Sequence, residues 1–252
     1  MEVVELFKDA LTYPTKDFSK LLILGVLAFV ATIPFFVMVL PLFFGSDVTA
    51  LAGMAVIGLL GALLVLILDI IYAGYGLNII KKTIALEEGL PEFDWGQMII
   101  DGIKVFILGI IYAIIPTILS AIIGFLGIGL STFAISADSM STFLVANFFV
   151  FFIIGIIYLI FGLLYIVALG RFAETDSLGA ALNVMDVFDK IGQIGWGNYI
   201  LWIIVLLILQ FVLNFVAGIL LAIVIGVIIV APFFLMYYSR AIGLLYNESK
   251  NY

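Results

Sequence analysis

Forty consecutive residues, from Tyr199 to Tyr238, carry no charged side chain. A single helix of that length is about 60 Å long, roughly twice the thickness of the hydrocarbon region of a bilayer. The stretch therefore predicts two membrane-spanning helices with a tight turn, which we place near Asn214–Gly218. Four further apolar stretches are each long enough to span once: Leu21–Phe44, Met54–Asn78, Ile103–Ile128 and Phe143–Gly170. We therefore expect an all-α integral membrane protein with six transmembrane helices.

A bilayer also explains the composition. The chain is 66% hydrophobic and 11% charged, whereas a soluble domain of 252 residues needs a charged surface. It contains no cysteine and no histidine, which excludes thiolate metal sites and removes the commonest general base. The net charge of −7 argues against a nucleic-acid partner. We expect no metal, no cofactor, and membrane lipids as the partners.

The basic residues predict the orientation. In a six-span arrangement all ten of them fall on one side of the membrane: Lys8, Lys16, Lys20, Lys81, Lys82, Lys104, Arg171, Lys190, Arg240 and Lys250. Lysine and arginine accumulate in cytoplasmic loops, so both termini are predicted to be cytoplasmic. The chain is thus expected to be a multi-pass protein of the cell membrane.

The six spans form three consecutive helical hairpins in one predicted domain. The approximate limits of the hairpins, within the domain of residues 1–252, are 1–80, 87–171 and 180–252. Tyr72 and Tyr165, near the cytoplasmic ends of the second and fourth spans, are 93 positions apart. This spacing favours an internal repeat, with chance matching among apolar residues as the alternative.

A segment with polar residues at helical spacing precedes each hairpin. The three sets are Glu2, Glu5, Lys8 and Asp9; Gln97, Asp101 and Lys104; and Asn183, Asp186, Lys190 and Gln193. Such segments are typical of amphipathic helices that lie in the plane of the interface, here on the cytoplasmic side. The acidic elbow of residues 87–97 would lead into the second of them. Three tryptophans on the same side are predicted to anchor at the lipid headgroups: Trp95, Trp196 and Trp202.

Asp69 is the one acidic residue deep in a predicted span. It lies nine positions before Asn78, about 13 Å along a helix, which places it near the middle of the bilayer. Carboxyl groups at that depth usually face a protein interior or a cavity, and small residues on the same stripe favour burial. The candidate intramembrane polar site comprises Asp69, Tyr72, Thr117, Gln210 and Asn214. It either bonds helices together, couples an ion or solute, or contacts a lipid headgroup.

The chain also resembles a known family. The residues that carry the resemblance are Tyr72, Tyr75 and Gly76, then Gly89-Leu90-Pro91, Trp95 and Gly102, and finally Tyr238-Ser239-Arg240. They resemble an archaeal polytopic membrane family catalogued as domain of unknown function 4013. The layout is more distantly similar to the membrane domain of some glycerophosphodiester phosphodiesterases. The resemblance implies a polytopic membrane protein, with no assigned activity or catalytic residues.

These observations favour a non-enzymatic protein with a membrane-organising or lipid-associated role. The main alternative is a small-solute or ion transporter or channel that uses Asp69. An intramembrane enzyme would need a second polar group close to Asp69, for which Tyr72 is the candidate within the same helix. A stripe of Gly218, Ala222 and Gly226 serves either intramolecular packing or a homo-oligomer. A membrane-protein partner also stays open.

Overall fold

The computed structural model describes residues 2–39, 48–129, 140–221 and 225–250, and these residues are helical apart from short connections. The elements are α1 (Val3–Thr12), the 3-10 helix η1 (Tyr13–Lys16), α2 (Phe18–Val39), α4 (Val48–Ile84), α5 (Trp95–Gly124), the π-helical turn η2 (Phe125–Gly129), α7 (Met140–Thr175), α8 (Leu178–Leu182), α9 (Val184–Ile194), α10 (Trp196–Leu221) and α11 (Ile225–Glu248). The described residues contain no strand, so the all-α prediction is confirmed.

Five helices among the described residues are each long and apolar enough to cross a membrane. They belong to α4, α5, α7, α10 and α11. The pair formed by α1–η1 and α2 is bent by 81° and supplies a sixth span if it is counted as one. This agrees with the predicted multi-spanning arrangement, and the division into three hairpins stays a prediction.

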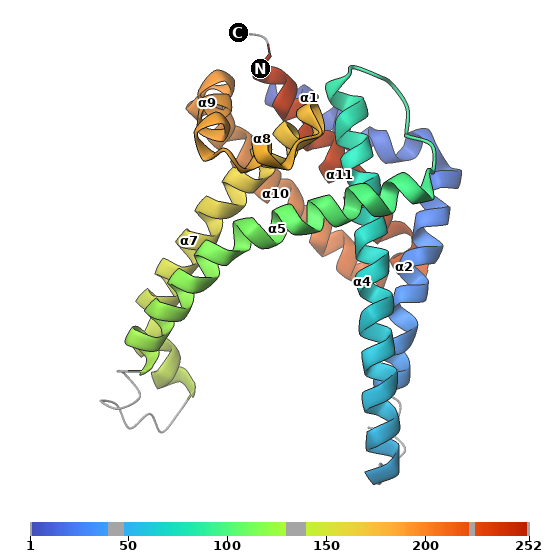
Figure 1. The fold of residues 1–252 in the computed structure, drawn as a ribbon, viewed down its shortest axis with the longest axis vertical. Helices are drawn as coiled ribbons and strands as arrows, with labels where there is room; N and C mark the ends of the chain where they lie inside the picture. Colours follow the sequence, from blue (N-terminus) through green and yellow to red (C-terminus); the bar gives the residue numbers. More distant parts are fainter. Residues whose placement is uncertain (1, 40–47, 130–139, 222–224, 251–252) are drawn as a thin grey trace.

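The helices form an arch (Figure 1). One leg consists of α2 and α4, and the other consists of the far parts of α5 and α7. The α5 helix crosses α4 obliquely near the top of the arch, and α10 passes behind α4 in this view. The top carries α1, α8 and α9 together with the adjoining ends of α4, α5, α7 and α11, and we call it the charged cap. Both termini lie at this cap.

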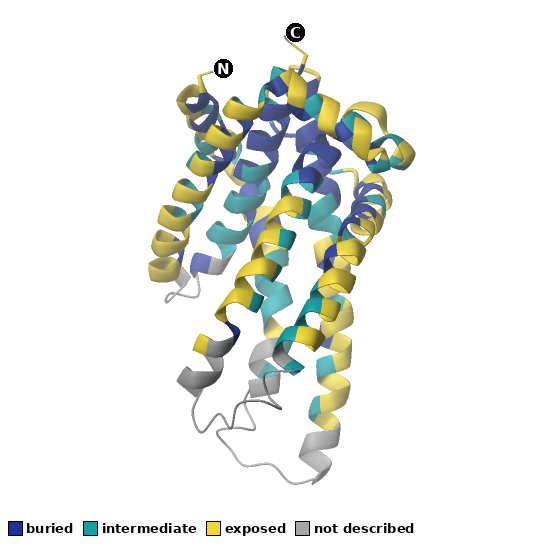
Figure 2. Ribbon diagram, turned by 90° about the vertical axis from the view of Figure 1, so that its left-hand side faces the viewer, coloured by how far each residue is buried: buried dark blue, intermediate teal, exposed yellow. Residues whose placement is uncertain are grey.

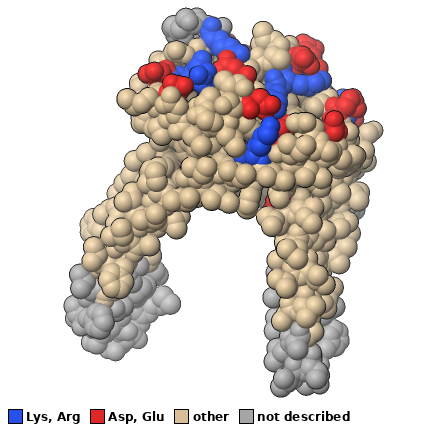
Figure 3. All heavy atoms as spheres, viewed as in Figure 1, with Lys and Arg blue, Asp and Glu red and all other residues tan. Residues whose placement is uncertain are grey.

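Charge and burial follow the same division. Figure 3 shows the lysine, arginine, aspartate and glutamate side chains of the visible face gathered at the cap. Figure 2 shows the buried residues concentrated there too, whereas the described parts of the legs are mostly exposed. The exposed side chains of the legs are large and apolar, such as Leu59, Ile118 and Phe149. Lipid is the environment in which such a surface is stable, so the legs are the membrane-facing part.

The close crossing of α4 and α5 depends on two glycines. A Cβ at Gly74 would lie 1.8 Å from the carbonyl oxygen of Met98, and one at Gly102 would lie 1.9 Å from that of Ile70. Neither backbone leaves room for a methyl group. Small residues allow helices in membranes to approach this closely and to gain van der Waals contact along the crossing.

The short amphipathic helices differ from the sequence prediction in what they face. In α1 the residues Val3, Leu6, Phe7 and Ala10 are buried at i, i+3, i+4 and i+7. Phe7 stacks on Trp202 of α10 with ring centroids 5.5 Å apart. The amphipathic helices are therefore present in α1 and α9, but their buried faces pack on protein rather than on acyl chains, because the spanning helices extend far enough to receive them.

Two predicted boundaries were wrong. No separate in-plane helix begins at Gln97, since α5 runs without a break from Trp95 to Gly124. The turn in the long uncharged stretch does not lie near Asn214–Gly218 either, since α10 continues to Leu221 and α11 begins at Ile225. Asn214 donates its side-chain amide to the carbonyl of Gln210 at 2.7 Å, which satisfies it within the helix. Of the Gly218, Ala222 and Gly226 stripe, Ala222 lies outside the described residues.

We predict that Gly102→Ala weakens the crossing of α4 and α5. The new methyl group must displace the backbone of Ile70, and overpacking of this kind costs about 1–3 kcal/mol. Thermal unfolding in a neutral detergent measures the effect. Gly155→Ala on α7 is the matched control, since a Cβ there meets nothing within 4 Å. Equal unfolding temperatures for the two variants would show that the crossing is not as tight as described.

Candidate functional site

The charged cap is held together by an ion-pair cluster around Asp101. Its carboxylate is 0% exposed, and it accepts hydrogen bonds from Lys81 Nζ at 3.1 Å and from Gln97 Nε2 at 2.9 Å. Lys104 lies 3.7 Å from the same carboxylate. Asp176, directly after α7, approaches Lys81 to 3.1 Å and Lys104 to 3.6 Å. Two lysines and two aspartates thus join α4, α5 and the end of α7.

The hydrogen bond from Lys81 holds the pKa of Asp176 below its usual value, with the charge of Lys104 adding to the effect. A carboxyl group whose pKa is lowered by folding stabilises the folded state at neutral pH. That contribution is lost as the pH falls through the lowered pKa. The cluster is therefore expected to weaken in acid.

A second set of contacts ties α11 to α1 and α4. Arg240 donates to both carboxylate oxygens of Asp9, at 2.7 and 3.2 Å, and to the hydroxyl of Thr83 at 3.2 Å. Its guanidinium lies 4.9 Å from the ring centroid of Tyr13. Tyr13 in turn donates to the carbonyl of Gly89 at 2.8 Å. Burial raises the pKa of Tyr13 to about 12, so this donor keeps its proton at any physiological pH.

Further ion pairs connect helices at the cap. Arg171 of α7 pairs with Glu174 at 3.2 Å and with Asp186 of α9 at 3.3 Å. Lys20, at the start of α2, lies 2.7 Å from Glu92 in the elbow. Every hairpin is thus bonded to another at its charged end.

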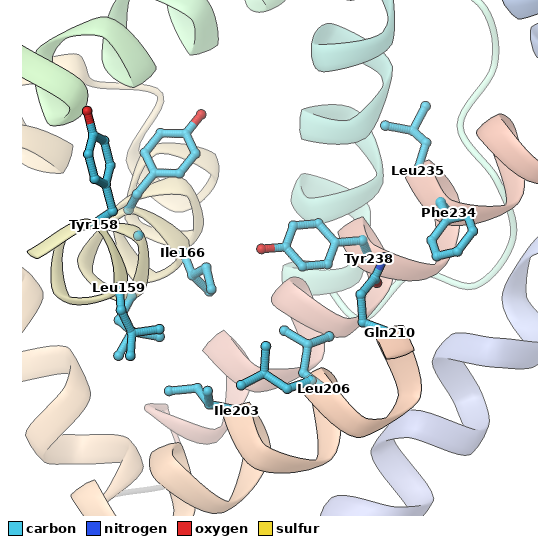
Figure 4. Close-up of a pocket in the computed structure, with 13 residues that line it drawn as sticks. Tyr158, Leu159, Ile166, Ile203, Leu206, Gln210, Phe234, Leu235 and Tyr238 are labelled. Atoms are coloured by element: carbon cyan, nitrogen blue, oxygen red, sulfur yellow. The ribbon is translucent and has the colours of Figure 1, made fainter. Parts of the chain in front are cut away.

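Beneath the cap, an open cavity of about 630 Å³ lies between α7, α10 and α11. Its volume lies within the range of roughly 300–1,000 Å³ that is typical of sites for small molecules. In Figure 4, Tyr238 extends from α11 toward α7, Ile203 and Leu206 form the α10 wall, and Ile166 lies on the α7 side. Figure 3 shows the open space under the cap between the two legs.

Two smaller cavities continue from this one. A cavity of about 220 Å³ between α5 and α7 shares Tyr158, Gly162 and Tyr165 with the first. A groove of about 400 Å³ between α4, α5 and α7 also includes Tyr165. Tyr165 therefore stands where all three meet. We call the three together the arch cavity.

The walls of the arch cavity are apolar, with a few polar groups. Tyr165 and Tyr238 have no hydrogen-bond partner among the described residues, and the same holds for the side-chain amide of Gln210. Tyr158 shares a hydrogen bond with Thr117 at 3.2 Å. Polar groups without partners at this depth are able to bond a ligand that enters the cavity.

Asp69 lines the groove, but the structure does not bury it as the sequence predicted. Asp69 is exposed, and it lies on the side of α4 that faces the groove, not on a side that packs against another helix. The reason is that the small residues of α4 serve the crossing with α5 at Gly74, five positions and about 7.5 Å further along the helix. The carboxyl group has no partner among the described residues.

The structure does not bring the predicted polar site together. Tyr72 donates its hydroxyl to the carbonyl of Leu24 on α2. Thr117 bonds across to α7, and Asn214 bonds within α10. Only Asp69 and Gln210 line the arch cavity, in different parts of it.

The tryptophans divide in the same way. Trp95 and Trp196 are 44% and 50% exposed near the cap, and their role as anchors at the headgroups stays a prediction. Trp202 is 0% exposed and stacks between Phe7 and Tyr199, so its prediction as an interfacial anchor was wrong. The amphipathic α1 covers it, and a single tryptophan in an apolar helix gives no sign of such a cover.

Sequence reasoning missed the tyrosines of the cavity as a group. Tyr165 was noticed only through its spacing from Tyr72, although the two residues end up with different roles. Tyr238 belongs to the resemblance motif, and Tyr158 was not assigned to the candidate site. Among the described residues, no group of three acidic residues is placed to hold a metal ion.

The fold and its cavity define a multi-spanning α-helical membrane protein. The chain belongs to the family described as Protein of unknown function (DUF4013), whose model matches residues 63–222, more than half of the chain. The match begins within α4 and ends with α10, so it includes Tyr165 and Asp69 but not Tyr238. No curated protein and no solved structure matches the chain.

We predict that Asp101→Asn destabilises the protein. The variant leaves two lysines at the cap with one aspartate instead of two. Breaking a buried pair costs about 3–5 kcal/mol, and we expect about 2–3 kcal/mol because both lysines reach solvent. Denaturant unfolding in detergent measures the loss.

Asp189→Asn is the matched control, because Asp189 is exposed and forms no ion pair among the described residues. A surface change of this kind alters stability by less than about 0.5 kcal/mol. Equal stability of the two variants would contradict the role given to the Asp101 cluster.

Proposed function

We propose that the protein is a non-enzymatic, lipid-associated protein that binds a membrane lipid in the arch cavity. The observation that carries the proposal is the cavity of about 630 Å³ between α7, α10 and α11, within the apolar part of the molecule. Its walls are leucine, isoleucine and aromatic side chains, which suit acyl chains. The splayed legs leave it accessible from the lipid side.

The polar groups fit the same ligand. Tyr238 lies two positions before Arg240, about 3 Å along α11, and Tyr165 lies six positions before Arg171, about 9 Å along α7. A lipid whose chains fill the cavity has its head at the level of these hydroxyls. The cap then holds the hairpins apart at a fixed angle while the lipid occupies the space between them.

The orientation belongs to the same proposal. Because lysine and arginine accumulate on the cytoplasmic side, the charged cap and both termini face the cytoplasm of the cell membrane. The archaeal source and the likeness to phosphodiesterase membrane domains stay predictions from the sequence.

A transporter or channel is the second candidate, and one observation favours it. Asp69 lines a groove that meets the main cavity at Tyr165, so an ionisable group lies along a connected set of cavities. The apolar walls around it favour lipid over a water-filled pathway.

Native mass spectrometry of the gently purified protein tests the lipid proposal. We expect a bound lipid at about one per chain, and we expect Gly162→Leu to lose most of it. Gly162 lines the main cavity and the cavity of about 220 Å³, and a Cβ there meets nothing within 4 Å, so the longer side chain fills space without disturbing the packing.

Gly155→Leu is the control for that experiment, since Gly155 has equal room, lies on the same helix and does not line the described cavities. Lipid retained by both variants, or lost by both, would contradict the proposal. A polar solute in place of lipid would favour the transporter.

The orientation has its own test, because the native chain has no cysteine. Single cysteines at Glu87, in the exposed elbow, and at Ser139, between the third and fourth spans in the sequence, are labelled in intact cells with an impermeant thiol reagent. We expect only Ser139→Cys to react before the cells are broken. Reaction of Glu87→Cys in intact cells would reverse the orientation.

A further inference from the structure

Asp69 is an acidic residue at the expected depth of the hydrocarbon region, and no described basic residue pairs with its charge. It lies twelve positions before Lys81, about 18 Å along α4. Lys81 and Lys104 are occupied by Asp101 and Asp176 in the cap. No described residue bonds the Asp69 carboxyl group, and the residue is exposed in the groove.

The groove around Asp69 has a composition that is complementary to a particular kind of ligand. Apart from Asp69 and the hydroxyl of Tyr165, its walls are apolar: Leu66, Ile70, Ala73, Val105, Phe106, Gly109, Ile110 and Ala113. Phe106 and Tyr165 add aromatic rings on the α5 and α7 sides. A carboxylate with aromatic and aliphatic walls attracts a cation that carries apolar groups.

We propose that this groove binds hydrophobic cations, in which an ammonium or phosphonium centre bears alkyl or aryl substituents. The cation compensates Asp69, and the substituents occupy the groove of about 400 Å³. The site goes beyond the lipid-associated role proposed above, which does not use Asp69.

Other occupants fit the groove less well. A hard metal cation takes about six to eight oxygen ligands, and the groove offers one carboxylate and one hydroxyl. The phosphate of a phospholipid is repelled by an ionised Asp69. A second copy of the chain would need to bring a cation to this depth, yet the described spans carry no lysine or arginine away from the cap.

The test measures binding of two probes of nearly equal shape and opposite charge, tetraphenylphosphonium and tetraphenylborate, to the full-length protein in a neutral detergent. Equilibrium dialysis is expected to give saturable binding of the phosphonium at about one per chain and none of the borate. Asp69→Asn is expected to weaken phosphonium binding by about tenfold or more. Asp189→Asn, a surface acid, is expected to leave it unchanged.

A second variant keeps the carboxyl group. Ala113→Leu narrows the groove from the α5 side, so we expect weaker phosphonium binding with Asp69 intact, and thermal unfolding shows that each variant is folded. Equal phosphonium binding by wild type and Asp69→Asn, or equal binding of both probes, would overturn the proposal. So would absence of binding, including the case in which native mass spectrometry finds a dimer that covers the groove.

The two proposals fail separately. Asp69→Asn is expected to keep the lipid of the main cavity, and Gly162→Leu is expected to keep phosphonium binding, because Gly162 does not line the Asp69 groove.

Discussion

The arrangement of this protein depends on a carboxylate that has no exposed surface. Asp101 is bonded by Lys81 and Gln97 and approached by Lys104, so α4 and α5 meet at one charge, and Asp176 at the end of α7 joins them through the same two lysines. A buried charge is costly unless such partners surround it, so the helix ends are held in one geometry. The glycine crossing of α4 and α5 lies next to this cluster along α5, at Gly102, and the two features fix the oblique angle of α5 together.

The consequence of fixing the hairpins at one end is that they diverge toward the other. Between the divergent helices lies the arch cavity, with Tyr165 at the junction of its three parts. In a soluble protein such a hollow with apolar walls would collapse or fill with water. We propose that lipid fills it in a bilayer, which connects the cap to the proposed function.

The sequence was sufficient for the all-α class and for several membrane-spanning helices, because a bilayer demands long apolar helices. It was insufficient for boundaries within apolar stretches. In the sequence between Gln210 and Ile225, nothing distinguishes a turn from a continuing helix. Asn214 is the polar residue there, and its side-chain amide donates to the carbonyl of Gln210 within the helix. The polar spacing of Gln97 and Asp101 predicted an interfacial helix, whereas Asp101 is buried by its ion pair with Lys81 of α4 and Gln97 stays exposed.

The candidate site shows the same limit. Asp69 was found because a charge in an apolar span is conspicuous. The partners expected for it bond elsewhere, as Tyr72 does to α2 and Thr117 to α7. Which residues face one cavity depends on the crossing angles of the helices, and those angles follow from long-range contacts at the cap that leave no local pattern.

The most direct test of this account measures what fills the arch cavity in a bilayer. Nitroxide labels on single cysteines at Leu159 and Phe234, on opposite walls, are compared with one at Leu108, which is 0% exposed in the protein core. In lipid nanodiscs the account predicts that the two cavity labels are relaxed by oxygen and not by a water-soluble nickel complex, with Leu108 protected from both. Relaxation of the cavity labels by nickel would show a water-filled pathway and contradict the lipid-associated function.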